Sequence, residues 1–193
     1  MYRHFLTEQW RLQTSKKRQP RIIGLTATPF RMKSGLLCGK KEILNEIVYE
    51  ANIQSLIADG YLSKPVSEKT THRVKLNNVR TQAGDFVGGD LDILYATDEL
   101  VDHHAKEILE AGEGRKGWLV FCSGINHAEK ISLALENLGV SIGLVHSKIT
   151  KESRTKILNE FREREIKCIV NVSVLTEGFD APHIDLIALL RPT

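Results

Sequence analysis

The second half of the chain alternates continuous apolar runs with amphipathic stretches, and this alternation constrains the fold more than any other feature. The apolar runs read GWLVFC (117–122), VSIGLVH (140–146), IKCIVNVSV (166–174) and IDLIALL (184–190). Such runs are typical of strands in a parallel sheet that is covered on both faces. Helical spacing of the apolar residues between them predicts helices over 98–111, 125–139 and 151–162. The alternation therefore predicts an α/β domain built from βαβ units, with Thr150 as the N-cap of its last helix.

Polar residues follow three of the predicted strands, at the point where each strand ends. Ser123 follows the first strand, His146 and Ser147 close the second, and the segment 176–182 follows the third. Because the carboxyl ends of parallel strands meet at one edge of the sheet, ligands bind along that edge. We therefore expect these three loops to form one site.

The first 62 residues show a weaker pattern. Apolar spacing predicts a helix over 1–16, and the run RIIGL (21–25) predicts a short buried strand that breaks into a loop at Thr26. The stretch 40–62 is mainly helical in its spacing and stops at Gly60.

The stretch 63–97 is rich in turn-forming residues, with Asn-Asn and Gly-Gly pairs. Its segment 67–76 is compatible with a strand. We interpret the whole stretch as a connector.

Composition and charge exclude several classes of protein. The 193 residues are 41% hydrophobic and 26% charged, which is ordinary for a soluble globular protein. No apolar run is long enough to span a bilayer and Met1 begins no signal peptide, so we expect a cytoplasmic protein without a membrane partner. The formal net charge of +3 is too small to indicate nucleic acid by itself. The oligomeric state stays open.

The cysteines and histidines give no metal-binding pattern. Cys38, Cys122 and Cys168 lack CxxC spacing, and two of them lie inside apolar runs, which predicts buried reduced thiols. We expect no metal site in this chain. Two segments imitate nucleotide motifs: GEGRKG (112–117) precedes a strand instead of following one, and SGLLCGKK has Ser34 where a P-loop has its first glycine. Neither is interpreted as a nucleotide site.

Three other stretches occur together and in order: GLTATPFR (24–31), WLVFCSGINHAEKI (118–131) and the segment from VHSKIT to GFDAP (145–182). With them the chain resembles the superfamily 2 helicases and translocases of the DEAD/DEAH type, most closely the RadD-like bacterial DNA-repair helicases and the Res-like motor subunits of restriction enzymes. The resemblance implies two RecA-like (P-loop NTPase-like) lobes, each a parallel sheet flanked by helices, with ATP between them. The chain would then run from motif III to just before motif VI. Its parts would be the tail of the first lobe (1–62), a connector (63–97) and a truncated second lobe (98–193).

The same resemblance implies roles for individual residues. Motif III couples the nucleotide state to the grip on nucleic acid, and its positions here are Thr26, Ala27 and Thr28. Positions that contact the nucleic-acid backbone are Ser123, His146, Ser147 and Thr176. The positions of motif V that face ATP are Glu177, Gly178 and Asp180.

The chemistry of these residues suits the implied roles and also permits structural ones. Gly178 lets the backbone approach a ligand closely, and Asp180 can accept a hydrogen bond from a ribose hydroxyl. However, Asp180 also suits an Asx-type turn, and Thr26 with Thr28 suits an ST-turn before Pro29. Ser123 and His146 are equally compatible with purely structural roles.

The resemblance implies a part of an ATP-dependent DNA helicase or translocase that acts in DNA repair, with ATP and Mg²⁺ as cofactors of the longer protein. The P-loop lysine, the Mg²⁺-holding carboxylate and the arginine finger fall outside this chain, so we expect no catalytic residue within it and no ATP hydrolysis by it alone. Three alternatives stay open. They are the motor of a type I or type III restriction enzyme, a catalytically inert RecA-like module that binds nucleic acid or protein, and an RNA substrate in place of DNA.

Overall fold

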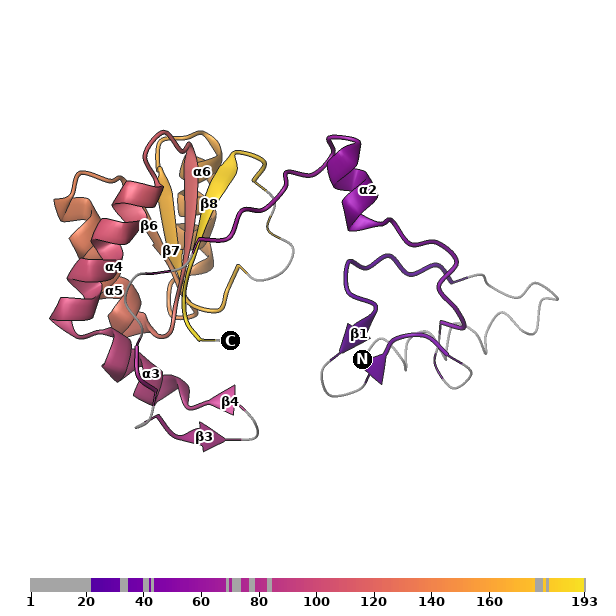
Figure 1. Cartoon of the computed structure of the whole chain (residues 1–193), viewed down its shortest axis with the longest axis horizontal. Helices are drawn as coiled ribbons and strands as arrows, with labels where there is room; N and C mark the ends of the chain where they lie inside the picture. Colours follow the sequence, from indigo (N-terminus) through magenta and orange to yellow (C-terminus); the bar gives the residue numbers. More distant parts are fainter. Residues whose placement is uncertain are drawn as a thin grey trace. The chain divides into compact units, whose positions relative to one another are not determined.

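The computed structural model describes residues 22–31, 35–39, 42, 44–68, 70, 74–76, 79–82, 85–175, 179 and 181–192. The chain divides into two compact units, Met1–Glu68 and Lys69–Thr193 (Figure 1). The division falls within the stretch that we interpret as a connector. Among the described residues, no helix has the length and apolar character needed to cross a membrane.

The described part of the first unit contains little regular structure. Strands β1 (Phe30–Arg31) and β2 (Gly35–Leu36) form a two-residue antiparallel pair. Helix α2 (Ile53–Ala58) begins at Asn52, whose side-chain oxygen accepts the N–H groups of Gln54 and Ser55 at 2.8 and 3.3 Å. It ends before Gly60, whose φ of +79° is readily adopted by glycine. The predicted stop is confirmed, but the helix is much shorter than the predicted stretch 40–62.

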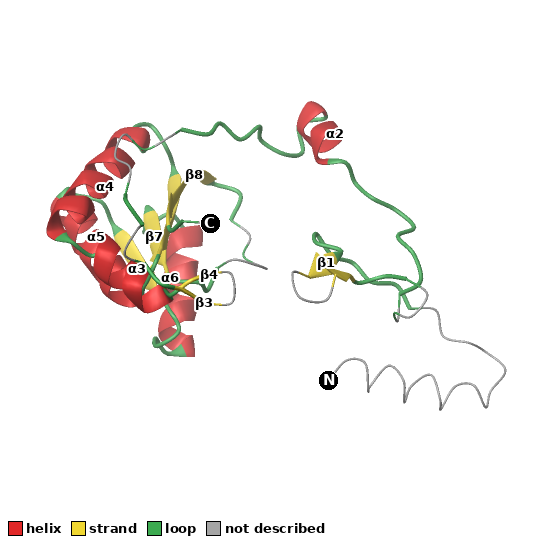
Figure 2. Cartoon of the chain, turned by 60° about the horizontal axis from the view of Figure 1, so that its bottom comes forward, coloured by secondary structure: helices red, strands yellow, loops and turns green. Residues whose placement is uncertain are grey.

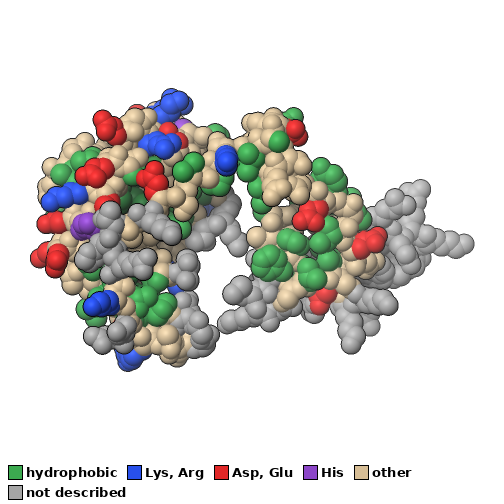
Figure 3. Space-filling view, in the orientation of Figure 1, with side chains coloured by type: hydrophobic (Ala, Val, Ile, Leu, Met, Phe, Trp, Pro, Cys, Tyr) green, Lys and Arg blue, Asp and Glu red, His purple; other side chains and the backbone are tan. Residues whose placement is uncertain are grey.

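The prediction of a buried strand over 21–25 is wrong. Residues 22–25 form no strand, and Ile23 and Leu25 are 80% and 96% exposed. A strand is stable only beside a neighbouring strand, and the described residues of this unit offer none to this segment. Figure 3 shows apolar side chains gathered on the visible face of the unit. Its most exposed large apolar residues are Ile23, Leu25, Val48, Tyr49, Tyr61 and Val66. The predicted helix over 1–16 lies outside the described residues.

The second unit is built on a four-stranded parallel sheet in the order β6-β7-β5-β8. Figure 2 shows strands of this sheet, among them β7 and β8, in yellow beside the red helices. Its strands are β5 (Gly117–Cys122), β6 (Ile142–Val145), β7 (Cys168–Asn171) and β8 (Ile184–Leu190). Pairing is parallel throughout, with Trp118 opposite Cys168 and Leu186, and Ile142 also opposite Cys168. The four predicted strands and the parallel α/β fold are confirmed.

Helices cover both faces of this sheet. The elements are α4 (Asp98–Ala111), α5 (Ile125–Asn137) and α6 (Lys151–Arg162). On one face, α4 and α5 pack over Trp118, Val120 and Cys122. On the other face, Phe161 of α6 packs over Leu119 and Ile169. Full burial of a side chain of this size stabilises the fold by about 1.5–3 kcal/mol, so the two layers together hold the unit.

The stretch interpreted as a connector contains elements that the sequence pattern did not predict. A two-residue hairpin, β3 (Thr81–Gln82) with β4 (Asp85–Phe86), leads into helix α3 (Gly88–Tyr95). Helix α3 packs against α5, and its Leu91 and Tyr95 are buried. The described residues of the possible strand 67–76 form no strand.

The prediction of buried reduced thiols is confirmed for the two cysteines that lie inside apolar runs. Cys122 and Cys168 are buried free thiols, and Cys38 is a half-buried one. Burial raises the pKa of the Cys168 thiol to about 12 and raises that of Cys122 as well. Both thiols therefore stay protonated at neutral pH and act as packing residues.

Candidate nucleic-acid interface

The carboxyl ends of all four parallel strands meet at one edge of the second unit. The loops that leave this edge begin at Ser123 after β5, at His146 after β6, at Val172 after β7 and at Arg191 after β8. The prediction that the loops after β5 and β6 share an edge is confirmed by the strand order. The third predicted loop starts at the same edge, because β7 ends at Asn171 between β6 and β5.

Ser123 is half-buried, and the protein itself holds its polar groups. Its hydroxyl lies 2.9 Å from Nδ1 of His127 and 3.4 Å from the carbonyl oxygen of Leu91. Its backbone N–H also donates to Nδ1 of His127, at 3.4 Å. The hydroxyl has one proton, and both the Leu91 carbonyl oxygen and Nδ1 of His127 lie within reach of it. A phosphate oxygen, which can only accept, would have to compete with these partners for that proton.

His127 is fully buried and was not selected by the sequence analysis. Burial, and after it the neighbouring His104, lower the pKa of its imidazole from 6.5 to about 4. The ring is therefore neutral at neutral pH. The ring of Tyr95 packs against it, with centroids 5.6 Å apart. A histidine in the first turn of an amphipathic helix gives no sequence signal that separates a buried ring from an exposed one.

Asp92 of α3 contacts the first turn of α5, which follows Ser123 and Gly124. Its carboxylate accepts the backbone N–H of His127 at 2.8 Å and that of Asn126 at 3.3 Å. These donors belong to the first turn of α5, whose N-cap, Gly124, makes no side-chain cap. The sequence held one signal of this contact: a helix preceded by glycine, and not by Ser, Thr or Asp, needs a cap from elsewhere.

The loop after β6 is more open. Ser147 and Lys148 are exposed, whereas His146 is half-buried. Nδ1 of His146 accepts the N–H of Lys148 at 3.2 Å, and its carbonyl oxygen accepts from the Arg154 guanidinium at 3.3 Å. These contacts fix the backbone of the loop while leaving the hydroxyl of Ser147 and the ammonium of Lys148 toward solvent.

Helix α6 starts directly after this loop. Its predicted N-cap is confirmed, since Thr150 Oγ1 accepts the N–H of Ser153 at 3.1 Å. Its first turns carry the exposed Lys151 and the half-buried Arg154. The end of β6 therefore brings together an exposed hydroxyl, two exposed ammonium groups and a helix N-terminus, a combination that suits phosphate.

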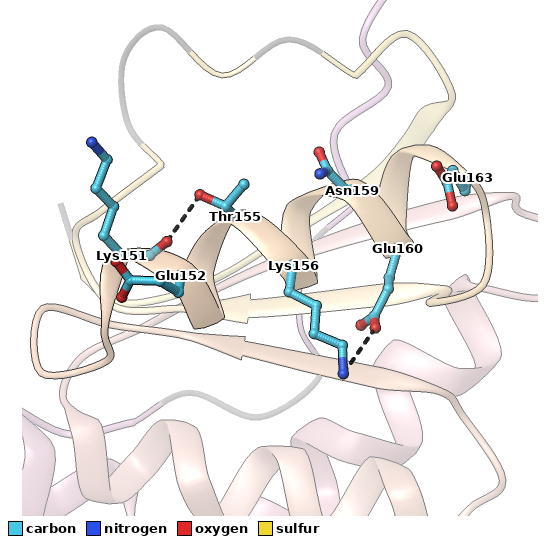
Figure 4. A pocket seen from close by; sticks show the side chains of 7 residues that line it. All are labelled: Lys151, Glu152, Thr155, Lys156, Asn159, Glu160 and Glu163. Carbon is cyan, nitrogen blue, oxygen red and sulfur yellow. Dashed lines mark hydrogen bonds and ion pairs between the residues drawn. The ribbon is translucent and has the colours of Figure 1, made fainter.

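A hollow of about 570 Å³ lies along the outer side of α6 (Figure 4). Its described lining comes from this one helix: Lys151, Glu152, Thr155, Lys156, Asn159, Glu160 and Glu163. Lys156 and Glu160 pair at 3.6 Å within it. Its acidic and basic groups are mixed and one helix cannot enclose a ligand, so the hollow does not extend the candidate interface.

Most of the predicted motif V residues, Thr176, Glu177, Gly178 and Asp180, lie outside the described residues. The described residues on either side of them are anchored in the core. Leu175 and Ala181 are 9% and 7% exposed, and the Phe179 ring lies 6.3 Å from that of Phe161. The described residues Leu175, Phe179 and Ala181 therefore all pack on the α6 face of the sheet.

Thr26, Ala27 and Thr28 belong to the first unit and are exposed. Thr26 Oγ1 accepts the N–H of Thr28 at 3.1 Å and donates to the carbonyl oxygen of Thr28 at 3.0 Å. This is the ST-turn before Pro29 that the sequence also permitted. Such a turn fixes the local backbone and is compatible with a coupling role, which stays a prediction.

The described residues contain no group of three or more His, Cys, Asp or Glu side chains that could hold a metal ion. The interface described above is built from hydroxyls, ammonium groups and backbone N–H groups. The ammonium and backbone N–H groups bind anions and have no lone pair to offer to Mg²⁺, which takes oxygen ligands.

Comparison with known proteins shows similarity to helicases. Residues 99–193 match the helicase conserved C-terminal domain. The "Putative mitochondrial ATP-dependent helicase irc3" of Schizosaccharomyces pombe is 31% identical over 89% of this chain, and IRC3 of Saccharomyces cerevisiae is 27% identical over all of it. The chain spans only 28% and 27% of the lengths of these relatives.

Among solved structures, the helicase domain of Hef from Pyrococcus furiosus is similar over 54% of this chain and 24% of that one, at 26% identity and a TM-score of 0.42. The matched residues 99–193 coincide with α4, the parallel sheet and the helices between its strands. The second unit thus contains a helicase conserved C-terminal domain, built on a parallel sheet that helices cover on both faces.

Proposed function

We propose that the chain works as part of an ATP-dependent helicase or translocase whose second lobe grips the backbone of a nucleic acid at the carboxyl edge of its sheet. The observation that carries the proposal is the open loop after β6, where Ser147, Lys148 and Lys151 are exposed beside the start of α6. The relatives named ATP-dependent helicases support the dependence on ATP.

The chemistry of this loop suits the backbone and not the bases. Ammonium groups and a hydroxyl contact phosphate oxygens, which are the same in every sequence. Neutralised phosphates release counterions, so the affinity should fall steeply with salt. A motor that moves along a strand needs this kind of grip, because a grip that read the bases would stall at particular sequences.

The remaining roles follow the resemblance stated above. We assign Thr176 to the backbone, with Ser123 and His146 beside it, and Glu177, Gly178 and Asp180 to ATP. Mg²⁺ would accompany ATP, and the groups that hold its phosphates in this class would come from the rest of the protein. Thr26, Ala27 and Thr28 would couple the two lobes.

We propose DNA as the substrate, in repair, because the quoted motifs most closely resemble those of DNA-repair helicases. A restriction-type motor would translocate on duplex DNA without separating its strands, so a strand-displacement assay distinguishes it. An RNA helicase would be stimulated by RNA and not by DNA.

The test is nucleic-acid-stimulated ATP hydrolysis by the full-length protein. Replacing Lys148 and Lys151 with alanine should raise the DNA concentration for half-maximal stimulation about tenfold or more, and leave the rate at saturating DNA nearly unchanged. The matched control replaces Arg115 and Lys116, two exposed cations that precede β5 at the opposite edge of the sheet. An equal loss in both double variants would show that the positive charge acts without regard to its position, and would refute the proposed grip.

A further inference from the structure

Helix α5 lacks an N-cap side chain of its own. It begins at Ile125, and its N-cap is Gly124. The first backbone N–H groups of a helix have no partner within the helix and carry a partial positive charge. Phosphates bind at such helix ends in many proteins. The start of α5 lies at the carboxyl edge of the sheet, where the proposed function places the nucleic-acid backbone.

A carboxylate of the protein already occupies this helix end. Asp92 accepts the N–H groups of His127 and Asn126 at 2.8 and 3.3 Å. Its helix, α3, is firmly held: Leu91 is fully buried, and the carbonyl oxygen of Leu91 lies 3.4 Å from the Ser123 hydroxyl. The carboxylate therefore belongs to the packed structure of the unit.

The position of this carboxylate leaves no room for a side chain at Gly124. Its φ of −163° and ψ of 177° are extended values that any residue adopts, so glycine is not required by the backbone. A Cβ at this position would lie 2.1 Å from Cγ of Asp92, far inside contact distance. The missing side chain of Gly124 thus makes room for Asp92, which performs the capping that a serine at position 124 would otherwise perform.

The start of α6 is arranged in the opposite way. Its cap is the neutral hydroxyl of Thr150, and the exposed Lys148 and Lys151 stand on either side of it, with one exposed carboxylate, Glu152, in the first turn. Along one edge of the sheet, the α5 end therefore carries a built-in negative charge, and the α6 end carries an excess of exposed positive charge.

We propose that Asp92 is an internal anion that closes the N-terminus of α5 to phosphate and so directs the nucleic-acid backbone to the loop before α6. This inference rests on the proposed function for its nucleic-acid part. The occupied N–H groups cannot bind a phosphate, and the carboxylate repels one nearby. Asp92 is thereby a specificity-determining residue for the path of the backbone, and it lies in α3, outside the matched domain that begins at residue 99.

The first experiment uses inorganic phosphate as the probe and amide NMR as the readout. In the wild-type chain, phosphate should leave the Asn126 and His127 resonances in place. In Asp92→Ala these resonances should shift on titration. In Asp92→Gly with Gly124→Ser they should again stay in place, because serine at the N-cap takes the same N–H groups. A shift in the wild type, or none in Asp92→Ala, would overturn the inference.

A double variant also controls for misfolding. A Cβ at position 124 would lie 2.1 Å from Cγ and 2.4 Å from Cβ of Asp92, so Gly124→Ser is combined with Asp92→Gly, which removes both atoms. The serine then restores the lost cap without that collision. The double variant should therefore unfold at a higher temperature than either Asp92→Gly or Gly124→Ser alone. If Gly124→Ser alone keeps the wild-type stability, the matched-pair argument is wrong.

The second experiment measures the affinity for a single-stranded oligonucleotide by fluorescence anisotropy. Asp92→Ala should bind about two- to fivefold more tightly than the wild type, since an anion site opens and a charge is removed. The control, Asp102→Ala, removes an exposed carboxylate on α4 and should leave the affinity unchanged. Equal or weaker binding by Asp92→Ala would overturn the inference. If the wild type binds no oligonucleotide, the proposed function fails, while the phosphate titration still decides whether Asp92 closes the helix end.

Discussion

The two units of the chain differ in how much structure their own residues support. In the second unit, Trp118 and Phe161 are 1% and 0% exposed within two apolar layers on a parallel sheet. In the described part of the first unit, α2 buries no residue and Leu25 is 96% exposed. Both units contain a stretch whose sequence resembles helicase motifs. Such a resemblance can be read from local sequence even where the described residues around it build no larger sheet, and among the described residues only those of the second unit form a packed scaffold.

The largest expected difference between the units is in the free energy of unfolding that is lost when a phenylalanine ring is removed. Phe161→Ala removes a fully buried ring that lies 4.5 Å from the ring of His183, and should lower the free energy of unfolding by about 3–5 kcal/mol. Phe30→Ala removes a ring that is 55% exposed in the first unit and should cost less than about 1 kcal/mol. Urea unfolding followed by Trp118 fluorescence, in a Trp10→Phe background, measures both. Similar losses would mean that the two units share one core.

Lowering the pH should destabilise the second unit, because His127 is kept unprotonated in the folded chain. Above pH 6.5 its imidazole is neutral in the folded and unfolded chains, and stability does not depend on it. As the pH falls from 6.5 towards 4, the unfolded chain binds a proton that the folded chain excludes, so the free energy of unfolding should fall by on the order of 3 kcal/mol.

The pH effect is read as a difference between variants in urea unfolding at several pH values. His127→Asn should remove most of the slope between pH 6.5 and 4. His103→Asn, on the partly exposed histidine 3.3 Å from Glu107, should keep it. A slope that survives His127→Asn would assign the acid sensitivity to another group.

A smaller effect should follow from overfilling the core. Gly112 has no positive φ, but a Cβ there would lie 2.0 Å from Cζ2 of Trp118. Gly112→Ala should therefore cost about 1–3 kcal/mol. Gly88→Ala, where a Cβ meets open space at the start of α3, should be neutral or slightly stabilising. Thermal unfolding of the two variants tests the packing around Trp118, and an unchanged midpoint for Gly112→Ala would contradict it.

The smallest expected effect compares two helix caps. Thr150→Ala and Asn52→Ala each remove a side chain that accepts an N–H of the following helix, at 3.1 and 2.8 Å. Each loss should be about 1 kcal/mol locally. The unfolding of the second unit should register the loss of Thr150 only, since α2 adds no buried residue to a core. An equal response to Asn52→Ala would show that α2 stabilises the second unit.

The sequence predicted the second unit well, because long periodic segments determine their own structure. Helix α4 spans the predicted residues 98–111, β5 and β8 span their predicted runs, and Thr150 caps α6 as expected. Helix α3 was missed because it starts with Gly88 and Gly89, which have low helix propensity and indicate a turn. Its structure depends on packing against α5, which local sequence does not reveal.

The site was predicted only in outline. The strand order places Ser123 and His146 at one edge, as expected, since that follows from a parallel sheet. The contact of Asp92 with the start of α5 joins residues 35 positions apart, and no periodicity encodes it. The buried state of His127 likewise depends on α3 and α4 covering it. The failed strand at 21–25 has the same cause, because a strand depends on neighbours that the local sequence does not supply.

The central claim is that the open loop after β6 grips the nucleic-acid backbone, and the most direct measurement is the salt dependence of binding. The affinity of this chain for a single-stranded oligonucleotide would be measured at several salt concentrations. Alanine at Lys148 and Lys151 should weaken binding for all oligonucleotide sequences alike and reduce the salt slope by about 1 for each lysine. Alanine at Arg115 and Lys116 should leave the slope unchanged. An unchanged slope for the first pair, or an equal reduction for the second, would contradict the account.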